Sequence, residues 1–182
     1  MAQAKRKKRF FDVDIPTIGK ETQLQAYEVQ ELAGRFIKYD LTRFLKGKSM
    51  ILTSEVEIKD NKASASPRKI MLMAYFLKRM VRKGTNYVED SFFAPCKNAQ
   101  LRIKPFLVTR RKVSRAVRKA LREKAREELT NHVKKLDFEQ VFDEIIKNQL
   151  QRELSSSLKK IYPLSLCEIR VLEVKKNPEK KE

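Results

Sequence analysis

The sequence is poor in the residues from which most metal sites and covalent cross-links are built. Its 182 residues include two cysteines, one histidine, four glycines and no tryptophan. Cys96 and Cys167 have neither a cysteine nor a histidine neighbour at metal-ligand spacing, so the sequence predicts neither a disulfide scaffold nor a zinc site. We expect both cysteines to be buried as small apolar residues, which is typical of proteins in a reducing compartment.

The sequence signatures of common enzymes are also absent. There is no phosphate-binding glycine loop and no nucleophile-elbow motif. Four acidic residues offer one alternative, a Mg²⁺-dependent nuclease site: Asp137, Glu139, Asp143 and Glu144. Asp137 is better placed to cap a helix, however, and the other three lie on or near its first turns, where the helix dipole stabilises carboxylates. We therefore expect no enzymatic activity, no cofactor and no metal ion.

Long apolar segments are missing as well. No apolar run approaches the roughly 18 residues that would indicate a membrane-spanning helix. The basic residues near the start of the chain are followed by polar residues, without the apolar segment of a secretory signal. We expect an intracellular, soluble protein with no membrane partner.

Positive charge is what the chain has in excess. The net charge is +19 and the sequence pI is about 10.0. Residues 1–9 hold five basic and no acidic residues, and residues 68–126 hold eighteen basic and three acidic ones, while the rest of the chain is nearly balanced. Because such a charge opposes compaction by self-repulsion, its concentration in two segments indicates a polyanionic partner, and nucleic acid is the natural candidate.

The patterning predicts an α+β protein with one domain. We expect a disordered basic N-terminal arm over residues 1–9, a single α+β domain over 10–176 and a frayed tail over 177–182. Alternating apolar residues predict strands at 32–42, 49–60, 85–93, 99–109 and 163–176. Apolar residues at helical spacing predict helices at 66–84 and 110–129 and two more within 137–162.

Two of these helices have candidate starting residues. Ser66 is a candidate N-cap with Pro67 in the first helical position, and Gly84 is a candidate stop. Thr109 is the candidate cap of the helix over 110–129.

The helix predicted over residues 110–129 carries nine basic and three acidic residues. Its arginines recur at steps of three or four positions, which places them on one side of a helix: Arg111, Arg115, Arg118, Arg122 and Arg126. The first three have no acid within one turn, so they repel one another, whereas a helix face shaped only for solubility usually mixes the two signs. Arginine also suits bidentate phosphate contacts. We therefore interpret this face as a nucleic-acid contact rather than as an ordinary solvated surface.

Other basic residues extend the candidate surface. The preceding strand contributes two, the helix over 66–84 contributes three, and the N-terminal arm contributes five. The complete set of candidate RNA-binding residues is Lys5, Arg6, Lys7, Lys8, Arg9, Arg79, Arg82, Lys83, Arg102, Lys104, Arg110, Arg111, Lys112, Arg115, Arg118, Lys119 and Arg122.

RNA fits this pattern better than DNA. The chain has no zinc-finger spacing, no basic region followed by heptads and no aromatic strand motif of the RNP type. A folded domain that is basic over a third of its length, with a separate basic arm, suits a large irregular RNA surface. The alternative is a free-standing RNA- or DNA-binding chaperone or a chromatin protein, which would bind many sequences with a steep salt dependence.

Four stretches, in this order, resemble the archaeal and eukaryotic small-subunit ribosomal protein family called S-three-A-e, or eukaryotic-type S-one. They are "FFDVDIPTIGKET" (10–22), "LAGRFIKYDLTRFLKGK" (32–48), "VTRRKVSRAVRKALREKAREEL" (108–129) and "IYPLSLCEIRVLEVKK" (161–176). Each stretch is weak alone, but the ordered set covers nearly the whole chain. The lack of long terminal extensions resembles the archaeal members.

The resemblance implies a fold, a place and partners. The fold is α+β with a mixed or antiparallel, β-barrel-like core and several helices. The place is the platform of the small subunit in the cytoplasmic ribosome, near the mRNA exit and the 3′ end of the small-subunit rRNA. The implied partners are that rRNA, neighbouring platform proteins including the S-eleven type, and mRNA near the exit. The implied function is that of a structural constituent of the subunit in translation.

Overall fold

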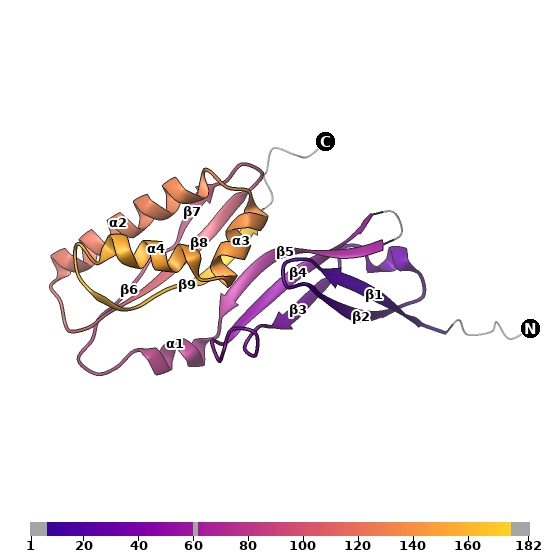
Figure 1. The fold of residues 1–182 in the computed structure, drawn as a ribbon, viewed down its shortest axis with the longest axis horizontal. Helices are drawn as coiled ribbons and strands as arrows, with labels where there is room; N and C mark the ends of the chain where they lie inside the picture. The colour runs from indigo at the N-terminus through magenta and orange to yellow at the C-terminus, as the bar shows by residue number, and fades with distance from the viewer. Residues whose placement is uncertain (1–6, 60–61, 176–182) are drawn as a thin grey trace, which may run out of the picture. The chain divides into compact units, whose positions relative to one another are not determined.

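The structure is a computed structural model, and it describes residues 7–59 and 62–175 (Figure 1). Lys5, Arg6 and the tail expected over 177–182 lie outside the described residues. The elements are β1 (Arg9–Ile15), β2 (Lys20–Ala26), the 3₁₀ helix η1 (Val29–Leu32), β3 (Phe36–Asp40), β4 (Met50–Lys59), β5 (Lys62–Leu72), α1 (Ala74–Met80), β6 (Tyr87–Glu89), β7 (Phe92–Pro95), β8 (Gln100–Thr109), α2 (Arg115–Val133), α3 (Phe138–Ile146), α4 (Gln149–Leu158) and β9 (Leu164–Lys175).

The predicted α+β class and the mixed sheet are confirmed. Nine strands pair in the order β2-β1-β5-β9-β8-β6, with β3 on β4 and β7 on β8. β1 and β5 pair in parallel, whereas β1–β2, β5–β9 and β8–β9 are antiparallel. Within the described part of the chain this path has free ends at β2 and β6, so the expected barrel-like core is an open sheet.

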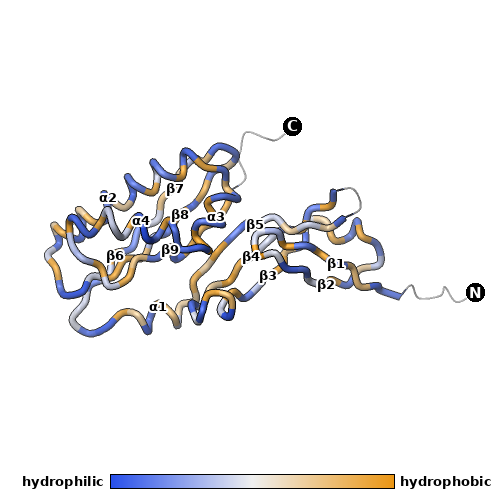
Figure 2. Tube along the Cα trace, viewed as in Figure 1, coloured by the Kyte–Doolittle hydropathy of each residue, from blue (hydrophilic) through white to orange (hydrophobic). Residues whose placement is uncertain are grey.

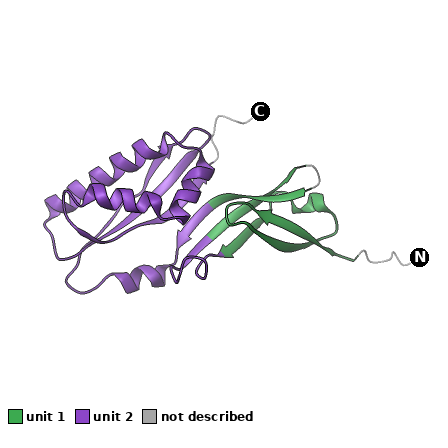
Figure 3. Ribbon diagram, in the orientation of Figure 1, with its two compact units in different colours: residues 1–39, 52–68 green, residues 40–51, 69–182 purple. Residues whose placement is uncertain are grey.

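The chain divides into two compact units (Figure 3). The first comprises residues 1–39 and 52–68, and the second comprises residues 40–51 and 69–182. β4 and β5 each run from one unit into the other. This division does not test whether residues 10–176 fold as one domain, so the single domain stays a prediction.

The first unit is built on the β1–β2 hairpin. Val13 and Ile15 of β1 are fully buried, whereas Asp12 and Asp14, which alternate with them, are exposed. This alternation is expected of a strand with one buried face. Gly19 closes the turn with φ +65°, a conformation that L side chains rarely adopt.

A single arginine holds two strands of the first unit together electrostatically. Arg68 of β5 lies 2.7 Å from Glu55 and 3.1 Å from Glu57, both on β4. These two carboxylates of β4 are therefore matched within the unit.

The second unit has two unlike sheet faces. Leu101 and Ile103 of β8 are buried, and the residues that alternate with them, Arg102 and Lys104, are half-buried on the opposite face. Helix α2 packs against β6, β7 and α4, and helices α3 and α4 pack against β9. In Figure 2 the trace of α2 alternates between hydrophilic and hydrophobic residues, as expected of a helix with one buried side.

The caps explain where the helices of this unit begin. The Ser114 side chain accepts a hydrogen bond from the Val117 backbone N–H at 3.4 Å, so α2 begins at Arg115. At the start of α3 the Asp137 backbone N–H donates to the Gln140 side chain at 3.2 Å. The prediction that Asp137 is an N-cap is confirmed.

The helix predicted over 66–84 is wrong in its first half. Residues 62–72 form β5, and only Ala74–Met80 are helical. Pro67, which matched the first position of a helix, lies instead between the part of β5 that pairs with β1 at Ala63 and the part that pairs with β9 from Lys69. Proline has no N–H to donate to a ladder, so within a strand it is tolerated at a point where no such hydrogen bond is needed.

The predicted cap of the next helix is also wrong. Thr109 is the last residue of β8, and its hydroxyl accepts from the Asn86 backbone N–H at 3.0 Å. Five residues, 110–114, then separate β8 from α2. The strands expected at 49–60, 99–109 and 163–176 are confirmed as β4, β8 and β9, and so are the two helices within 137–162. The strand expected at 32–42 is shorter, since only Phe36–Asp40 form β3, and the one expected at 85–93 is divided into β6 and β7.

Lys48 is a buried lysine of the second unit. Lys48 is 8% exposed, and its Nζ lies 2.6 Å from the Glu168 carboxylate of β9. The same Nζ donates to the Asn148 side chain at 2.7 Å. A buried ammonium needs such partners because desolvation of an unpaired charge is costly, so this cluster ties the segment 40–51 to β9 and to the start of α4.

Candidate nucleic-acid interface

Helix α2 presents its arginines beside its buried side. Leu121, Ala125 and Leu129 are buried at four-residue steps. Arg122 directly follows Leu121, and Arg118 lies four residues before Arg122. Both arginines therefore lie about 100° around the helix from the line of buried residues. Together with Arg115 these side chains form what we call the arginine stripe: Arg115, Arg118 and Arg122.

No member of the arginine stripe forms an ion pair with any described residue. Arg115 and Arg122 are exposed, and Arg118 is half-buried. The Nε atom of Arg118 is covered and has no hydrogen-bond partner within the described ranges. Because the three are three and four residues apart, they repel one another by a few tenths of a kcal/mol per pair. Folding alone gives no reason for this arrangement.

The second half of α2 is different. Lys124 lies 3.1 Å from Glu127 and 3.2 Å from Glu128, and hydrogen bonds to these carboxylates raise the pKa of Lys124 above its usual range. Lys119, between the two halves, lies 3.8 Å from Glu123. Both lysines are thus matched by acids on the same helix.

Arg126 holds α2 against the β6–β7 edge. Its Nε and one terminal nitrogen donate to the two carboxylate oxygens of Asp90, each at 3.0 Å, and its guanidinium lies over the Phe92 ring, 5.5 Å from the centroid. Asp90 lies between β6 and β7. Because Arg126 continues the line of Arg118 and Arg122 at a four-residue step, the line follows the side of α2 that faces these two strands.

Two basic loops meet at one end of the second unit. The Asn86 side chain accepts from the Val113 backbone N–H at 2.8 Å, and the Asn86 carbonyl accepts from the Thr109 N–H at 2.9 Å. These bonds join the loop after α1 to the segment before α2. We call the cations of the two loops the basic loop cluster: Arg82, Lys83, Arg110, Arg111 and Lys112. All five are exposed.

Three other predicted residues lie elsewhere in the second unit. Arg79 is exposed on α1, with its guanidinium 5.5 Å from the centroid of the Phe76 ring. Arg102 and Lys104 line a hollow of about 420 Å³ on the sheet face opposite the buried face of β8. The structure therefore does not bring Arg102 and Lys104 together with the arginine stripe.

The described part of the N-terminal arm belongs to the first unit. Lys7, Lys8 and Arg9 are exposed, and Arg9 is the first residue of β1, opposite Ala26. The Nζ of Lys8 lies 5.6 Å from the centroid of the Tyr27 ring. Lys5 and Arg6, the other candidates of the arm, lie outside the described residues.

Two cations near the predicted site were missed by the sequence reasoning. Lys69 of β5 and Arg170 of β9 line the same hollow as Arg102 and Lys104. Register explains the grouping, because Glu173 of β9 pairs with both Lys69 and Arg102. The alternation of polar and apolar residues at 69–71 could have predicted a strand here. The helical spacing of the residues that follow led instead to the prediction of a helix.

The acidic residues considered as a nuclease site are used in other ways. Asp137 caps α3, and Glu144 lies 2.7 Å from the His132 ring. Among residues 7–59 and 62–175 there is no group of three or more metal-ligating side chains. Of the described helices, none is long and apolar enough to cross a membrane.

The protein has an α+β fold, and its cations without a described partner lie along one edge of α2 and in the neighbouring loops. These features fit the class of polyanion-binding proteins, in which nucleic-acid binders are the main group. Comparison with known proteins makes the assignment specific. The model of the Ribosomal S3Ae family matches residues 2–178, and the chain belongs to this family of ribosomal proteins. The resemblance inferred from the four sequence stretches is confirmed.

Curated relatives bear the same name. Small ribosomal subunit protein eS1 of Nanoarchaeum equitans is 26% identical, with 91% of this chain and 87% of the relative covered. The protein of that name from Pyrobaculum neutrophilum is 27% identical over 88% of this chain and 74% of the relative. That from Saccharolobus islandicus is 25% identical over 94% and 86%.

Proposed function

We propose that the protein is a structural constituent of the small ribosomal subunit that binds small-subunit rRNA through the arginine stripe and the basic loop cluster. The proposal depends mainly on one observation. The stripe has no carboxylate partner within the described residues, although the same helix pairs its other cations with acids. A phosphate backbone would supply the missing negative charge, and arginine can bind it with two hydrogen bonds at once.

The family supports the small-subunit role, since the relatives carry that subunit in their names. The finer location is also a proposal: the platform, near the mRNA exit and the 3′ end of the rRNA, beside proteins that include the S-eleven type. The role is architectural rather than catalytic, and it is carried out in the cytoplasmic ribosome. Lys5 to Arg9 add further phosphate contacts to the rRNA.

Sedimentation combined with crosslinking tests this proposal. A tagged copy of the chain is followed through gradients of a native lysate at low and high salt, and the RNA crosslinked to it is sequenced. We expect co-migration with the small subunit at both salt concentrations and crosslinks clustered near the 3′ end of its rRNA. A protein released by salt together with scattered RNA sequences would instead support a free-standing nucleic-acid chaperone, because non-specific binding is dominated by salt-sensitive phosphate contacts.

A further inference from the structure

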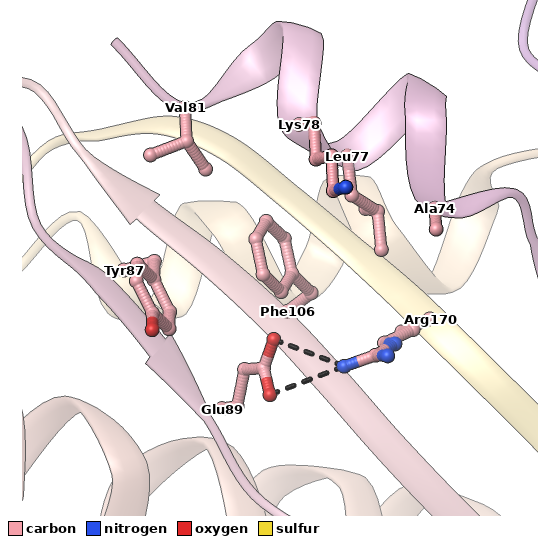
Figure 4. A pocket seen from close by; sticks show the side chains of 8 residues that line it. All are labelled: Ala74, Leu77, Lys78, Val81, Tyr87, Glu89, Phe106 and Arg170. Atoms are coloured by element: carbon pink, nitrogen blue, oxygen red, sulfur yellow. Dashed lines mark hydrogen bonds and ion pairs between the residues drawn. The ribbon is translucent and has the colours of Figure 1, made fainter. Parts of the chain in front are cut away.

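A pocket of about 410 Å³ lies between α1 and the sheet of the second unit (Figure 4). Leu77 of α1 and Val81, the residue that follows this helix, form one wall, and the rings of Tyr87 and Phe106 form the other. Those rings lie nearly parallel, with centroids 5.9 Å apart and 17° between their planes. The volume is within the range that small organic groups occupy in proteins.

Tyr87 has a free aromatic surface. Phe106 is 3% exposed, but Tyr87, which lies against it, is 55% exposed. Tyr87 is the first residue of β6 and directly follows Asn86, the residue that joins the basic loop cluster. An exposed aromatic ring that is backed by a buried one, and that lies beside unpaired cations, resembles the stacking platforms of proteins that bind single-stranded nucleic acid.

The charges around the pocket favour RNA over an apolar protein segment. Lys78 lines the pocket and has no ion-pair partner among the described residues. The one acid of the lining, Glu89, is already paired with Arg170 at 3.1 Å, as the dashed lines in Figure 4 show. The remaining charges near the pocket are therefore positive, and they complement a phosphate backbone.

The pocket lies close to the proposed interface at β6. β6 is an edge strand whose Val88 side chain is buried and whose Tyr87 and Glu89 line the pocket. The arginine stripe follows the side of α2 that packs on β6 and β7, so a strand of RNA bound there can turn around β6 into the pocket. On its other side the pocket adjoins the hollow lined by Arg102 and Lys104, because both share Ala74 and Arg170.

We infer that this pocket binds an unpaired nucleotide of RNA, with the base stacked on Tyr87 and its flanking phosphates held by Lys78 and the basic loop cluster. The inference rests on the proposed RNA-binding function and adds a specific subsite to it. Base-paired RNA has no base free to enter the pocket, so this subsite distinguishes single-stranded from duplex RNA.

The absence of tryptophan from the chain makes a direct test possible. Tyr87→Trp introduces a single tryptophan, and a base stacked on it should quench its fluorescence when an unstructured oligoribonucleotide is added to the full-length protein. The matched control is Tyr75→Trp, because Tyr75 is also on this unit, is 56% exposed and does not line the pocket. We expect quenching at position 87 only, and only by single-stranded RNA. Equal quenching by duplex RNA, or none by either RNA, would overturn the inference.

Affinity measurements separate this subsite from the proposed function as a whole. Tyr87→Leu should weaken single-strand binding about tenfold and leave duplex binding unchanged, Tyr87→Phe should retain binding, and Tyr75→Leu should have no effect. Loss of the arginine stripe by Arg115→Glu and Arg118→Glu should weaken both kinds of binding. If the stripe variant fails to bind while Tyr87→Leu binds both RNAs normally, the subsite is wrong and the proposed function stands.

The same position identifies the source of the nucleotide in the assembled subunit. A photoreactive phenylalanine analogue is placed at position 87. A crosslink to rRNA in subunits stripped of mRNA would show that the bound nucleotide belongs to rRNA. A crosslink to mRNA that forms only after mRNA is added would show that it belongs to mRNA. Crosslinks that reach protein alone would show that a neighbouring protein fills the pocket, which would refute the inference.

Discussion

Lys48 and Arg118 are cations of the same compact unit, yet the fold treats them in opposite ways. Lys48 is buried against the Glu168 carboxylate and the Asn148 amide. Arg118 lies among other arginines, and its covered Nε has no partner within the described part of the chain. Desolvation explains the first arrangement, because a buried ammonium without a partner would not be tolerated. The second is not required by folding and costs stability. Unpaired cations such as Arg118, rather than the total charge, are therefore the basis of the proposed binding surface.

The largest effect is expected from breaking the buried pair. Lys48→Met leaves the Glu168 carboxylate buried without its counter-charge, so the free energy of unfolding should fall by about 3–5 kcal/mol. Denaturant unfolding measures this loss. Lys97→Met removes an exposed lysine that has no ion pair with any described residue, so it should change stability by less than about 0.5 kcal/mol. Similar losses in both variants would show that Lys48 is not the structural cation described here.

Reversing the stripe should affect binding instead of stability. Arg115→Glu with Arg118→Glu replaces two unpaired cations, so the affinity for RNA should fall on the order of a hundredfold and the slope of log K against log salt should decrease by about 2. Filter binding over a salt series gives both numbers. The control is Lys147→Glu with Lys159→Glu, which makes the same change in net charge at the exposed C-cap positions of α3 and α4. An equal loss in this control would mean that only net charge matters.

Separating the two basic loops should have an intermediate effect. Asn86→Ala removes the side-chain oxygen that accepts from the Val113 N–H, so stability should fall by about 1 kcal/mol. The basic loop cluster would also lose its shared anchor, and we expect RNA affinity to fall several-fold. Hydrogen exchange at Val113 should increase in parallel. Weaker binding without faster exchange would indicate that Asn86 contacts the RNA itself.

Removing acids from the second half of α2 should extend the unpaired surface. Glu123→Gln with Glu127→Gln releases Lys119 and weakens the pairing of Lys124, so RNA affinity should rise a few-fold while stability changes by less than about 1 kcal/mol. The same binding assay measures it. No rise in affinity would restrict the interface to the first half of the helix and sharpen its boundary.

The smallest effect concerns Cys167, next to Glu168. Burial, together with the charge of Glu168, raises the pKa of this thiol to about 12. At pH 8 the thiol therefore stays protonated, and iodoacetamide should not alkylate it in the folded protein, although it should react after unfolding. Mass spectrometry of the labelled peptide measures this. The pKa of the thiol is about 9.0 in the unfolded chain and about 12 in the folded protein. The protonated thiol therefore contributes its full stabilisation below pH 9, and this stabilisation is lost as the pH rises toward 12.

Local patterns predicted the elements that have a clear periodicity of their own. The helices within 137–162 and the strands β4, β8 and β9 follow their own periodicity. The start of the helix over 66–84 was misplaced because Pro67 satisfies the rules for a helix start as well as those for a break between strand partners. Only the pairing of β5 with β1 and β9, which are distant in the sequence, decides between the two. Thr109 was misassigned for the same reason, since its hydrogen-bond partner Asn86 lies 23 positions away.

The candidate interface was predictable in part. The spacing of Arg115, Arg118 and Arg122 on one helix was visible in the sequence, and so was the lack of nearby acids. The separation of Arg102 and Lys104 from these arginines was not, because it depends on which face of the sheet the helices cover. The pocket was also hidden, since Leu77, Tyr87 and Phe106 come from three different elements.

The position of β9 in the sheet sets an order for folding during synthesis. β9 is the last strand along the sequence, but it pairs with β8 on one side and with β5 on the other. Until residues 164–175 have been made, both neighbours have backbone N–H and C=O groups exposed along one edge, and such edges promote aggregation. The second unit therefore cannot close by gradual addition of strands. It must wait for β9, so a nascent chain stalled before that strand should depend on chaperones even though every basic residue of the interface has already been synthesised.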